Sequence, residues 1–189
     1  MPIPRLSRQR LSGLILITVA CLVLSSLPVQ AQSGSIVPGR SIGVFHIGDP
    51  IETVTEVLGP ASPPALLPQA MLSYYWPSRH LGVMVDVVTR KIVALAGSAD
   101  VDYRTAKGVG IGSGADEVQS AFGRTPGIDN GDGTTVFVYD RVGVAFVVAR
   151  AVSLRDRVST IWVFSPGGYH QIFPKPLTAA APHLSTALR

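Results

Sequence analysis

A glycine-rich run from Gly108 to Gly114, with the sequence GVGIGSG, is the first group of residues whose spacing could support chemistry. Loops that bind phosphate need either a lysine followed by Ser or Thr, or a third glycine at a fixed step. No lysine follows this run, and Ala115 stands where G-x-G-x-x-G needs its last glycine. The run therefore predicts a flexible approach to a helix rather than a nucleotide site.

The segment from Asp129 to Gly133, with the sequence DNGDG, has the composition of a calcium loop. An EF-hand register ending at Gly133 would place Ile128 at the first acidic ligand, and no Glu follows at the closing position. A polar turn before a strand explains these residues better. The sequence predicts no metal site and no cofactor.

The histidines are scattered along the chain, at positions His46, His80, His170 and His183. No H-x-x-H, H-E-x-x-H or G-x-S-x-G occurs, and Asp86 is the only acid in the expected strands of the first half. A site built from a serine, His46 and Asp86 would have to be assembled by the fold, since no spacing indicates it. The sequence favours a non-enzyme. A hydrolase or small-ligand binder whose site is not visible in the sequence is the alternative.

Aromatic residues on the expected strands are the candidates for a binding surface. Tyr and Trp combine an apolar body with a polar tip, and both are enriched at protein interfaces. If helices cover one face of the sheet, some of these residues could line the other face and bind another protein; packing in a second core layer is the alternative reading. The candidates are Tyr74, Tyr75, Trp76, Phe137, Tyr139, Trp162 and Phe164.

Alternating apolar residues predict the strands that carry these aromatics. Val83, Val85 and Val87 have the period of two that is typical of half-buried antiparallel strands. Turn residues separate the first two strands of each half. The expected strands are Leu72–Trp76, Leu81–Val87, Lys91–Ala96, Thr135–Tyr139, Val142–Val148 and Val158–Phe164.

Two segments 64 residues apart match without a gap, IGDPIE at 47–52 and IGSGAD at 111–116. In each, a residue suited to cap a helix comes first, Asp49 or Ser113, and a glycine suited to end it follows, Gly59 or Gly123. The predicted apolar faces of these helices are Ile51, Val54, Val57 and Leu58, and Ala115, Val118, Ala121 and Phe122.

These matches predict an α+β protein made of two tandem repeats, residues 36–100 and 101–167. Each repeat would be a short helix packed on an antiparallel sheet. Because about 64 residues bury too little apolar surface to be comfortable alone, we expect the two repeats to share one core.

The pattern G-x-x-x-G-D/S-x-x-E/D-x-V-x-x-x-L/F-G, followed by an aromatic strand and a valine-rich hairpin, resembles tandem repeats of secreted bacterial proteins. Those repeats are similar to the β-lactamase-inhibitor-protein architecture and to the small outer-membrane assembly lipoproteins of the SmpA/OmlA family. The resemblance covers residues 36–167. It implies a helix layer on an antiparallel sheet and a role in protein binding, in envelope assembly or enzyme inhibition. No functional residue is carried over, because the matching positions are those of capping and packing.

Residues 1–31 have the three parts of a signal peptide. Arginines precede an apolar stretch at 14–24, and Val29-Gln30-Ala31 supplies the small residues of a cleavage site. The apolar stretch is shorter than the ~20 residues that span a bilayer, so we expect a periplasmic or secreted protein. Cys21 is the only cysteine, and the apolar core continues beyond it, which is untypical of a lipoprotein. Membrane attachment is expected only if Cys21 is lipidated.

The charge of the chain gives no indication of nucleic-acid binding. The full chain has 16 Lys and Arg against 12 Asp and Glu, and three of the arginines lie in the predicted signal, which leaves 13 against 12. No basic cluster remains to follow a phosphate backbone. The last residues, 168–189, are rich in proline and contain no acid, and they are predicted to be a disordered tail.

Overall fold

The computed structural model describes residues 35–98, 102–151 and 154–173. These residues belong to one compact unit. The predicted signal peptide with Cys21, and the tail from residue 174 onward, lie outside the described residues.

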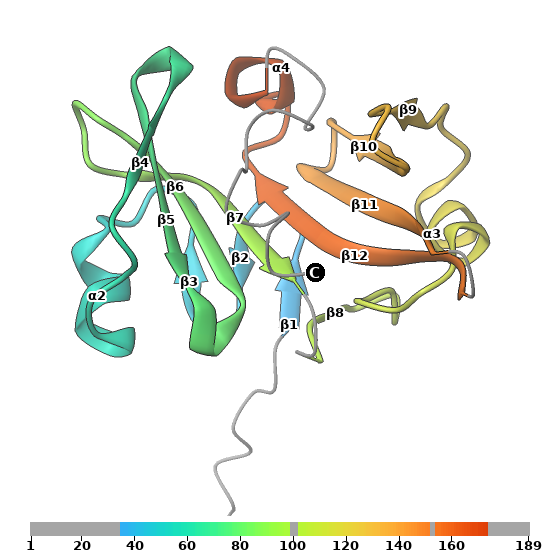
Figure 1. Cartoon of the computed structure of the whole chain (residues 1–189), viewed down its shortest axis with the longest axis horizontal. Coiled ribbons are helices and arrows are strands. Elements are labelled where there is room, and N and C mark those ends of the chain that lie inside the picture. The colour runs from blue at the N-terminus through green and yellow to red at the C-terminus, as the bar shows by residue number, and fades with distance from the viewer. Residues whose placement is uncertain (1–34, 99–101, 152–153, 174–189) are drawn as a thin grey trace, which may run out of the picture. The chain divides into compact units, whose positions relative to one another are not determined.

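A large antiparallel sheet and a small sheet form the two layers of the structure (Figure 1). The large sheet has eight strands in the order β4 (Ala65–Leu67), β5 (Met71–Trp76), β6 (Leu81–Asp86), β7 (Ile92–Ser98), β12 (Leu154–Phe164), β11 (Val144–Ala151), β10 (Thr134–Tyr139) and β9 (Ile128–Asp129). The small sheet has the order β3 (Phe45–His46), β2 (Ser41–Ile42), β1 (Ser35–Val37) and β8 (Arg104–Thr105). Short 3-10 turns, η1 (Pro68–Ala70) and η2 (Pro77–Arg79), join β4 to β5 and β5 to β6.

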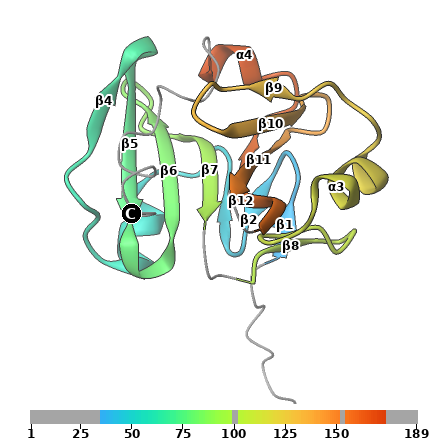
Figure 2. The ribbon, with the colours of Figure 1, turned by 45° about the vertical axis from the view of Figure 1, so that its right-hand side comes forward.

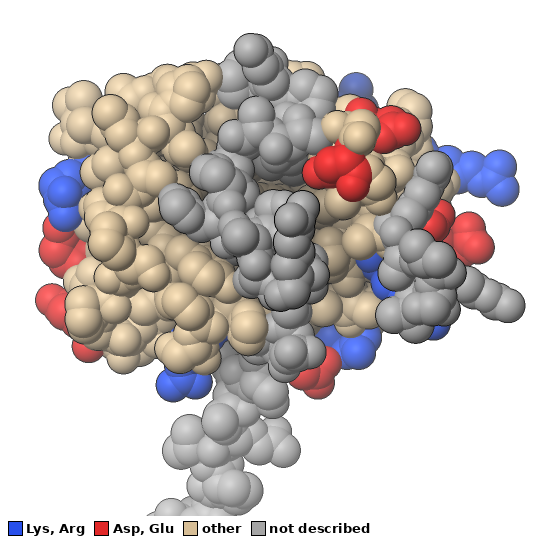
Figure 3. Space-filling view, in the orientation of Figure 1, with Lys and Arg blue, Asp and Glu red and all other residues tan. Residues whose placement is uncertain are grey.

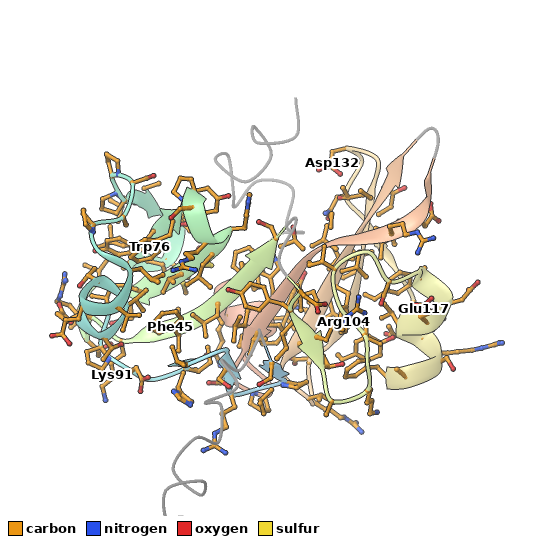
Figure 4. The ribbon with its side chains drawn as sticks, turned by 90° about the horizontal axis from the view of Figure 1, so that it is seen from below. Phe45, Trp76, Lys91, Arg104, Glu117 and Asp132 are labelled. Carbon is orange, nitrogen blue, oxygen red and sulfur yellow. The ribbon has the colours of Figure 1, made fainter. Side chains whose placement is uncertain are left out.

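Helices α2 (Glu52–Leu58) and α3 (Ala115–Phe122) pack with the small sheet on one face of the large sheet. The main core lies between these layers and includes Phe45 from the small sheet and Val54 and Val118 from the helices. Figure 4 shows this layering from below, with Phe45 and Trp76 at the α2 end and Glu117 at the α3 end. We call this the helix face of the large sheet.

The opposite face of the large sheet, which faces the viewer in Figure 1, is the front face. A third helix, α4 (Tyr169–Ile172), packs against it near β12, and a second apolar cluster lies there. Figure 2 shows α4 above the β9–β10 half of the sheet. Side chains alternate between the two faces along each strand, so one strand contributes to both clusters. Val83 and Val85 belong to the main core, whereas Met84 belongs to the second cluster.

The α+β class and the six predicted strands are confirmed, each within a few residues of its predicted bounds. The two halves of the large sheet meet where β7 pairs with β12, with Leu95 opposite Val163. Both residues are fully buried, so the main core runs across this junction.

The predicted helix caps are wrong. The Asp49 carboxylate accepts a hydrogen bond from the backbone N–H of His46 at 3.2 Å, and the Ser113 hydroxyl accepts one from the N–H of Gly110 at 3.2 Å. Each side chain therefore binds the backbone amide three residues before its own position and does not cap the first turn of the helix. The N-cap of α3 is Gly114, whose N–H donates to the carboxylate of Glu117.

Two further corrections concern the surface. Val57, predicted for the apolar face of α2, is 64% exposed. Residues 168–173, predicted to belong to the disordered tail, form α4 and the residues that flank it. Tyr169 and Phe173 are each only 2% exposed, since they pack on the front face of the sheet.

Candidate functional site

Five of the seven candidate aromatics are buried, so they do not form an exposed surface in this structure. The two tryptophans, Trp76 and Trp162, are only 2% and 4% exposed, and Phe137, Tyr139 and Phe164 are buried as well. These five residues therefore pack in the core, which is the alternative interpretation of the aromatic strands.

Trp76 and Tyr139 place their polar atoms on the ends of the two helices. The indole Nε1–H of Trp76 donates to the carbonyl of Gly59 at 3.0 Å, and the hydroxyl of Tyr139 donates to the carbonyl of Gly123 at 2.8 Å. Both glycines have positive φ and end α2 and α3, as predicted. Burial of a Trp or Tyr is favourable here because its polar group is satisfied by a carbonyl left unpaired at a helix end.

An aromatic cluster fixes α3 against the sheet. The ring of Phe122 lies 5.3 Å from that of Tyr139 and 5.1 Å from that of Phe146. The ammonium group of Lys107 lies 4.8 Å from the centre of the Phe122 ring and donates to the carbonyl of Ala121 at 2.5 Å. A cation at this position interacts favourably with both the ring and the C-terminal end of the helix.

Trp162 and Phe164 anchor α4 on the front face. The ring of Trp162 lies 5.0 Å from that of Phe173, and the ring of Phe164 lies 5.7 Å from that of Tyr169. The hydroxyl of Tyr169 is buried and has no hydrogen-bond partner among the described residues. Burial raises the pKa of this phenol.

Tyr74 and Tyr75 are the two candidates that remain half-exposed, and they lie on opposite faces of β5. Tyr74 packs against the main core, with its ring 6.2 Å from that of Trp76. Tyr75 lies on the front face, opposite Gly82 of β6, which has no side chain to cover it. Tyr75 is thus the one candidate that stays half-exposed on the face opposite α2 and α3.

The polar candidates each have a local structural role. His46 contacts Asp49, with Nδ1 3.3 Å from Oδ2. The carboxylate of Asp86 accepts bonds from the N–H groups of Val88 and Thr89 at 3.1 and 2.7 Å and from the Thr89 hydroxyl at 2.9 Å. The bonds from Thr89 hold the pKa of Asp86 below its usual range. The Asp86 carboxylate therefore builds a turn and is not directed to His46.

Most backbone amides of the glycine-rich run are hydrogen-bonded within the fold. The N–H of Gly108 donates to the carbonyl of Thr105, and that of Gly112 donates to the carbonyl of Val158, both at 2.8 Å. The N–H of Gly110 is taken by Ser113. A phosphate-binding loop needs such amides free to point at the ligand, so these bonds agree with the structural interpretation of the run.

The acidic loop before β10 is organised as a series of turns. Asp129 accepts from the N–H of Gly131 at 2.8 Å, and Asp132 accepts from the N–H and hydroxyl of Thr134 at 2.9 and 2.6 Å. Within the described ranges, no group of three or more His, Cys, Asp or Glu side chains is placed to hold a metal ion.

Titration shifts in the described residues have structural causes. A hydrogen bond from Arg90 lowers the pKa of Glu52, and the Arg90 Nε and Nη2 atoms lie 3.0 and 2.8 Å from the same Glu52 oxygen. Burial raises the pKa of Tyr103 and of Tyr139. None of these shifts belongs to a pair of groups poised as acid and base in a cleft.

The two edges of the large sheet are poorly suited to pairing with another strand. β4 has three residues, and prolines at positions 63, 64 and 68 flank it. β9 has two residues and leads into the acidic turn. Short, proline-flanked or charged edges resist strand addition, so a partner would have to bind through side chains.

An uncharged surface covers the β4–β6 part of the front face. Figure 3 shows no Lys, Arg, Asp or Glu there; charged side chains lie at the left and lower margins of this region, and others lie on the right-hand side of the view. Its described residues include the half-buried Leu67, Ser73 and Tyr75. We call these three residues, with the strands that carry them, the neutral face.

No protein-family model matches the chain, and no curated protein does. Two solved structures are similar in a general way: a cysteine-rich secretory protein from Staphylococcus aureus and an extracellular protein containing an SCP domain from Bacillus anthracis. The first has a TM-score of 0.47 and 13% identity, over 79% of this chain and 52% of the other. The second has a TM-score of 0.46 and 11% identity, over 71% of this chain and 51% of the other. The chain thus spans about half the length of each.

None of the described helices is long and apolar enough to cross a membrane.

Proposed function

We propose that this chain is an exported, non-enzymatic module that binds another protein through the neutral face. The observation that carries the proposal is the pairing of an uncharged surface with Tyr75, a rigidly held tyrosine that stays half-exposed on it. Interfaces are depleted of charge at their centre and enriched in tyrosine, with polar residues around the rim. The partner would belong to envelope assembly or be an extracellular enzyme that the chain inhibits.

The rigidity of this surface supports binding rather than catalysis. Tyr75 is the fifth of the six residues of β5 and pairs with Gly82 of β6. On its other side its carbonyl accepts a hydrogen bond from the N–H of Ser62 at 3.0 Å, so its backbone is held on both sides. A fixed aromatic loses little conformational freedom on binding, whereas a catalytic site would need positioned titratable groups. The titratable groups in the described residues with shifted pKa values serve structural bonds or are buried phenols.

The neutral face is tested by comparing two adjacent tyrosines. Tyr75→Ala should weaken capture of the partner from envelope extract at least about fivefold, the equivalent of ~1 kcal/mol. Tyr74→Ala is the matched control, because that ring points to the helix face and its loss should reduce stability but not capture. Equal loss in both variants, at matched folded fraction, would remove the support for this surface.

We further propose that the fold arose as two repeats, 36–100 and 101–167, sharing one core. Three features support this. From the β7–β12 pair, the two halves of the large sheet run outward in the orders β7-β6-β5-β4 and β12-β11-β10-β9. Each half has a helix that ends at a glycine, and in each half the aromatic residue at the end of a strand, Trp76 or Tyr139, donates a hydrogen bond to the carbonyl of that glycine. A chain ending near Asp100 should be unfolded, because β7 would lose β12. Cooperative melting of that half would show that the repeats are separate domains.

A further inference from the structure

Two neighbouring turns at one end of the large sheet form an apolar tip that the proposed protein-binding surface does not use. One turn is η1, between β4 and β5, and the other joins β6 to β7. Three aliphatic side chains are exposed in or beside these turns: Val88 by 85% and Val87 by 39% in the β6–β7 turn, and Leu66 by 72% in β4, two residues before η1. Figure 1 shows both turns projecting from the same end of the β4–β7 half. We call Leu66, Val87 and Val88 the apolar tip.

The backbone of the tip is hydrogen-bonded internally. The N–H of Val87 donates to the carbonyl of Ala70 at 3.0 Å, which joins one turn to the other. The N–H groups of Val88 and Thr89 are both taken by the Asp86 carboxylate, and the N–H of Arg90 is taken by the Asp86 carbonyl at 2.9 Å. Polar groups that are already paired cost much less to move out of water than unpaired ones.

Two of the three charged side chains in the β6–β7 turn are held in local bonds, and the third, Lys91, is exposed at the end of the turn. Arg90 follows Thr89, but its guanidinium turns to Glu52 on α2. Asp86 stands at the base of the turn and is occupied by Val88 and Thr89. The aliphatic side chains of the tip therefore carry no charge themselves. Because the Asp86 carboxylate lies at the base of the turn, the tip could enter an apolar medium only to a shallow depth.

The backbone of η1 is held in an unusual conformation. Gln69 and Ala70 are consecutive non-glycine residues with φ of 67° and 52°. This left-handed region is costly for residues with a Cβ and is concentrated at functional positions. The β4–β5 hairpin adopts this conformation nonetheless, and Leu66, two residues before η1, is exposed.

We infer that the apolar tip inserts shallowly into the surface of a lipid bilayer. Its size favours lipid over protein: three aliphatic side chains expose on the order of 250 Å², whereas a stable protein interface needs about 800 Å² from each partner. Its shape agrees, since a projecting convex turn enters a fluid layer without needing a complementary groove. The three side chains of the tip are uncharged, so insertion should not require anionic lipid, although Lys91, exposed at the end of the β6–β7 turn, should strengthen binding to such lipid.

The test is flotation of the exported, purified chain with vesicles of phosphatidylcholine alone and of phosphatidylcholine with phosphatidylglycerol. Intact mass first establishes which N-terminus the chain carries. The wild-type chain should float with both kinds of vesicle, and flotation should persist at high salt. Val88→Asp and Leu66→Asp should each reduce binding about tenfold or more.

Val57→Asp is the matched control, because Val57 is a 64%-exposed valine on α2 and should leave binding unchanged. A retained leader or a lipid on Cys21 would anchor every variant equally, so the comparison is made on protein that intact mass shows to carry neither. Absence of flotation with either vesicle would overturn the inference. So would equal loss in Val57→Asp, or binding that needs anionic lipid and disappears in salt. Cross-linking of position 88 to a protein without vesicle binding would assign the tip to a protein partner instead. Val88→Ser, a milder change, checks that loss does not come from misfolding.

Discussion

Removing the hydroxyl of Tyr139 should destabilise the fold, whereas removing the hydroxyl of Tyr169 should not. The Tyr139 hydroxyl donates to the carbonyl of Gly123 at the end of α3. In Tyr139→Phe that carbonyl loses its partner, and a net loss of about 0.5–1.5 kcal/mol is expected, rising if water cannot reach the carbonyl. The rings of Phe122 and Phe146 would still pack against position 139, so the loss should be confined to the hydrogen bond.

Tyr169→Phe deletes a buried hydroxyl that has no partner among the described residues. An unpaired buried polar group costs free energy in the folded state, so its removal should be neutral or stabilising, by up to about 1 kcal/mol. Both variants keep the aromatic ring, which makes the hydroxyl the single difference.

Urea unfolding of the two variants and the wild-type chain measures this contrast. With an m-value of about 2 kcal/mol/M, a loss of ~1 kcal/mol lowers the midpoint by roughly 0.5 M. Tyr139→Phe should show this decrease at unchanged m, and Tyr169→Phe should show none. Equal destabilisation by both changes would refute the reasoning, because it would mean that the Tyr169 hydroxyl is bonded in solution.

Three other outcomes are expected. Intact mass of the exported protein should give Gln32 as the first residue, and a diacylglyceryl adduct on Cys21 would show a lipoprotein instead. Phe122→Ala should lower the free energy of unfolding by about 2–5 kcal/mol in thermal or urea melts, because it opens a cavity, whereas Val57→Ala should change it by less than about 0.5 kcal/mol. Glu52 has a pKa lowered by its arginine partner, so the pair contributes stability above the ordinary glutamate pKa that is lost as the pH falls through the lowered value. Glu52→Gln should therefore lose less stability than wild type on acidification below pH 4.5; an unchanged acid profile would show that the pair contributes nothing.

The strands and the helix ends could be predicted from sequence because their signals are local. Alternation in β6 identifies a strand with two different faces, and Gly59 and Gly123 supply the positive φ that ends each helix. The N-terminal caps could not be predicted in this way. Asp49 and Ser113 have the right chemistry for a cap, but upstream amides compete for the same oxygen atoms.

The exposure of the aromatics depends on partners distant in sequence. Nothing near Trp76 indicates that its indole N–H meets a carbonyl 17 residues away. Likewise α4 lies in a segment with the composition of a tail, and it is ordered by Trp162 and Phe164 beneath it. The strands of the small sheet, at two or three residues each, are too short for any periodic signal.

The most direct test of the proposed function is site-specific photo-cross-linking from the neutral face in the exporting cell. A benzophenone side chain placed at Tyr75 should give a discrete adduct with another protein, and the same group at Val57, an exposed position on α2, should give none. Adducts of equal yield at both positions, or none at position 75, would contradict the claim that this face binds a partner.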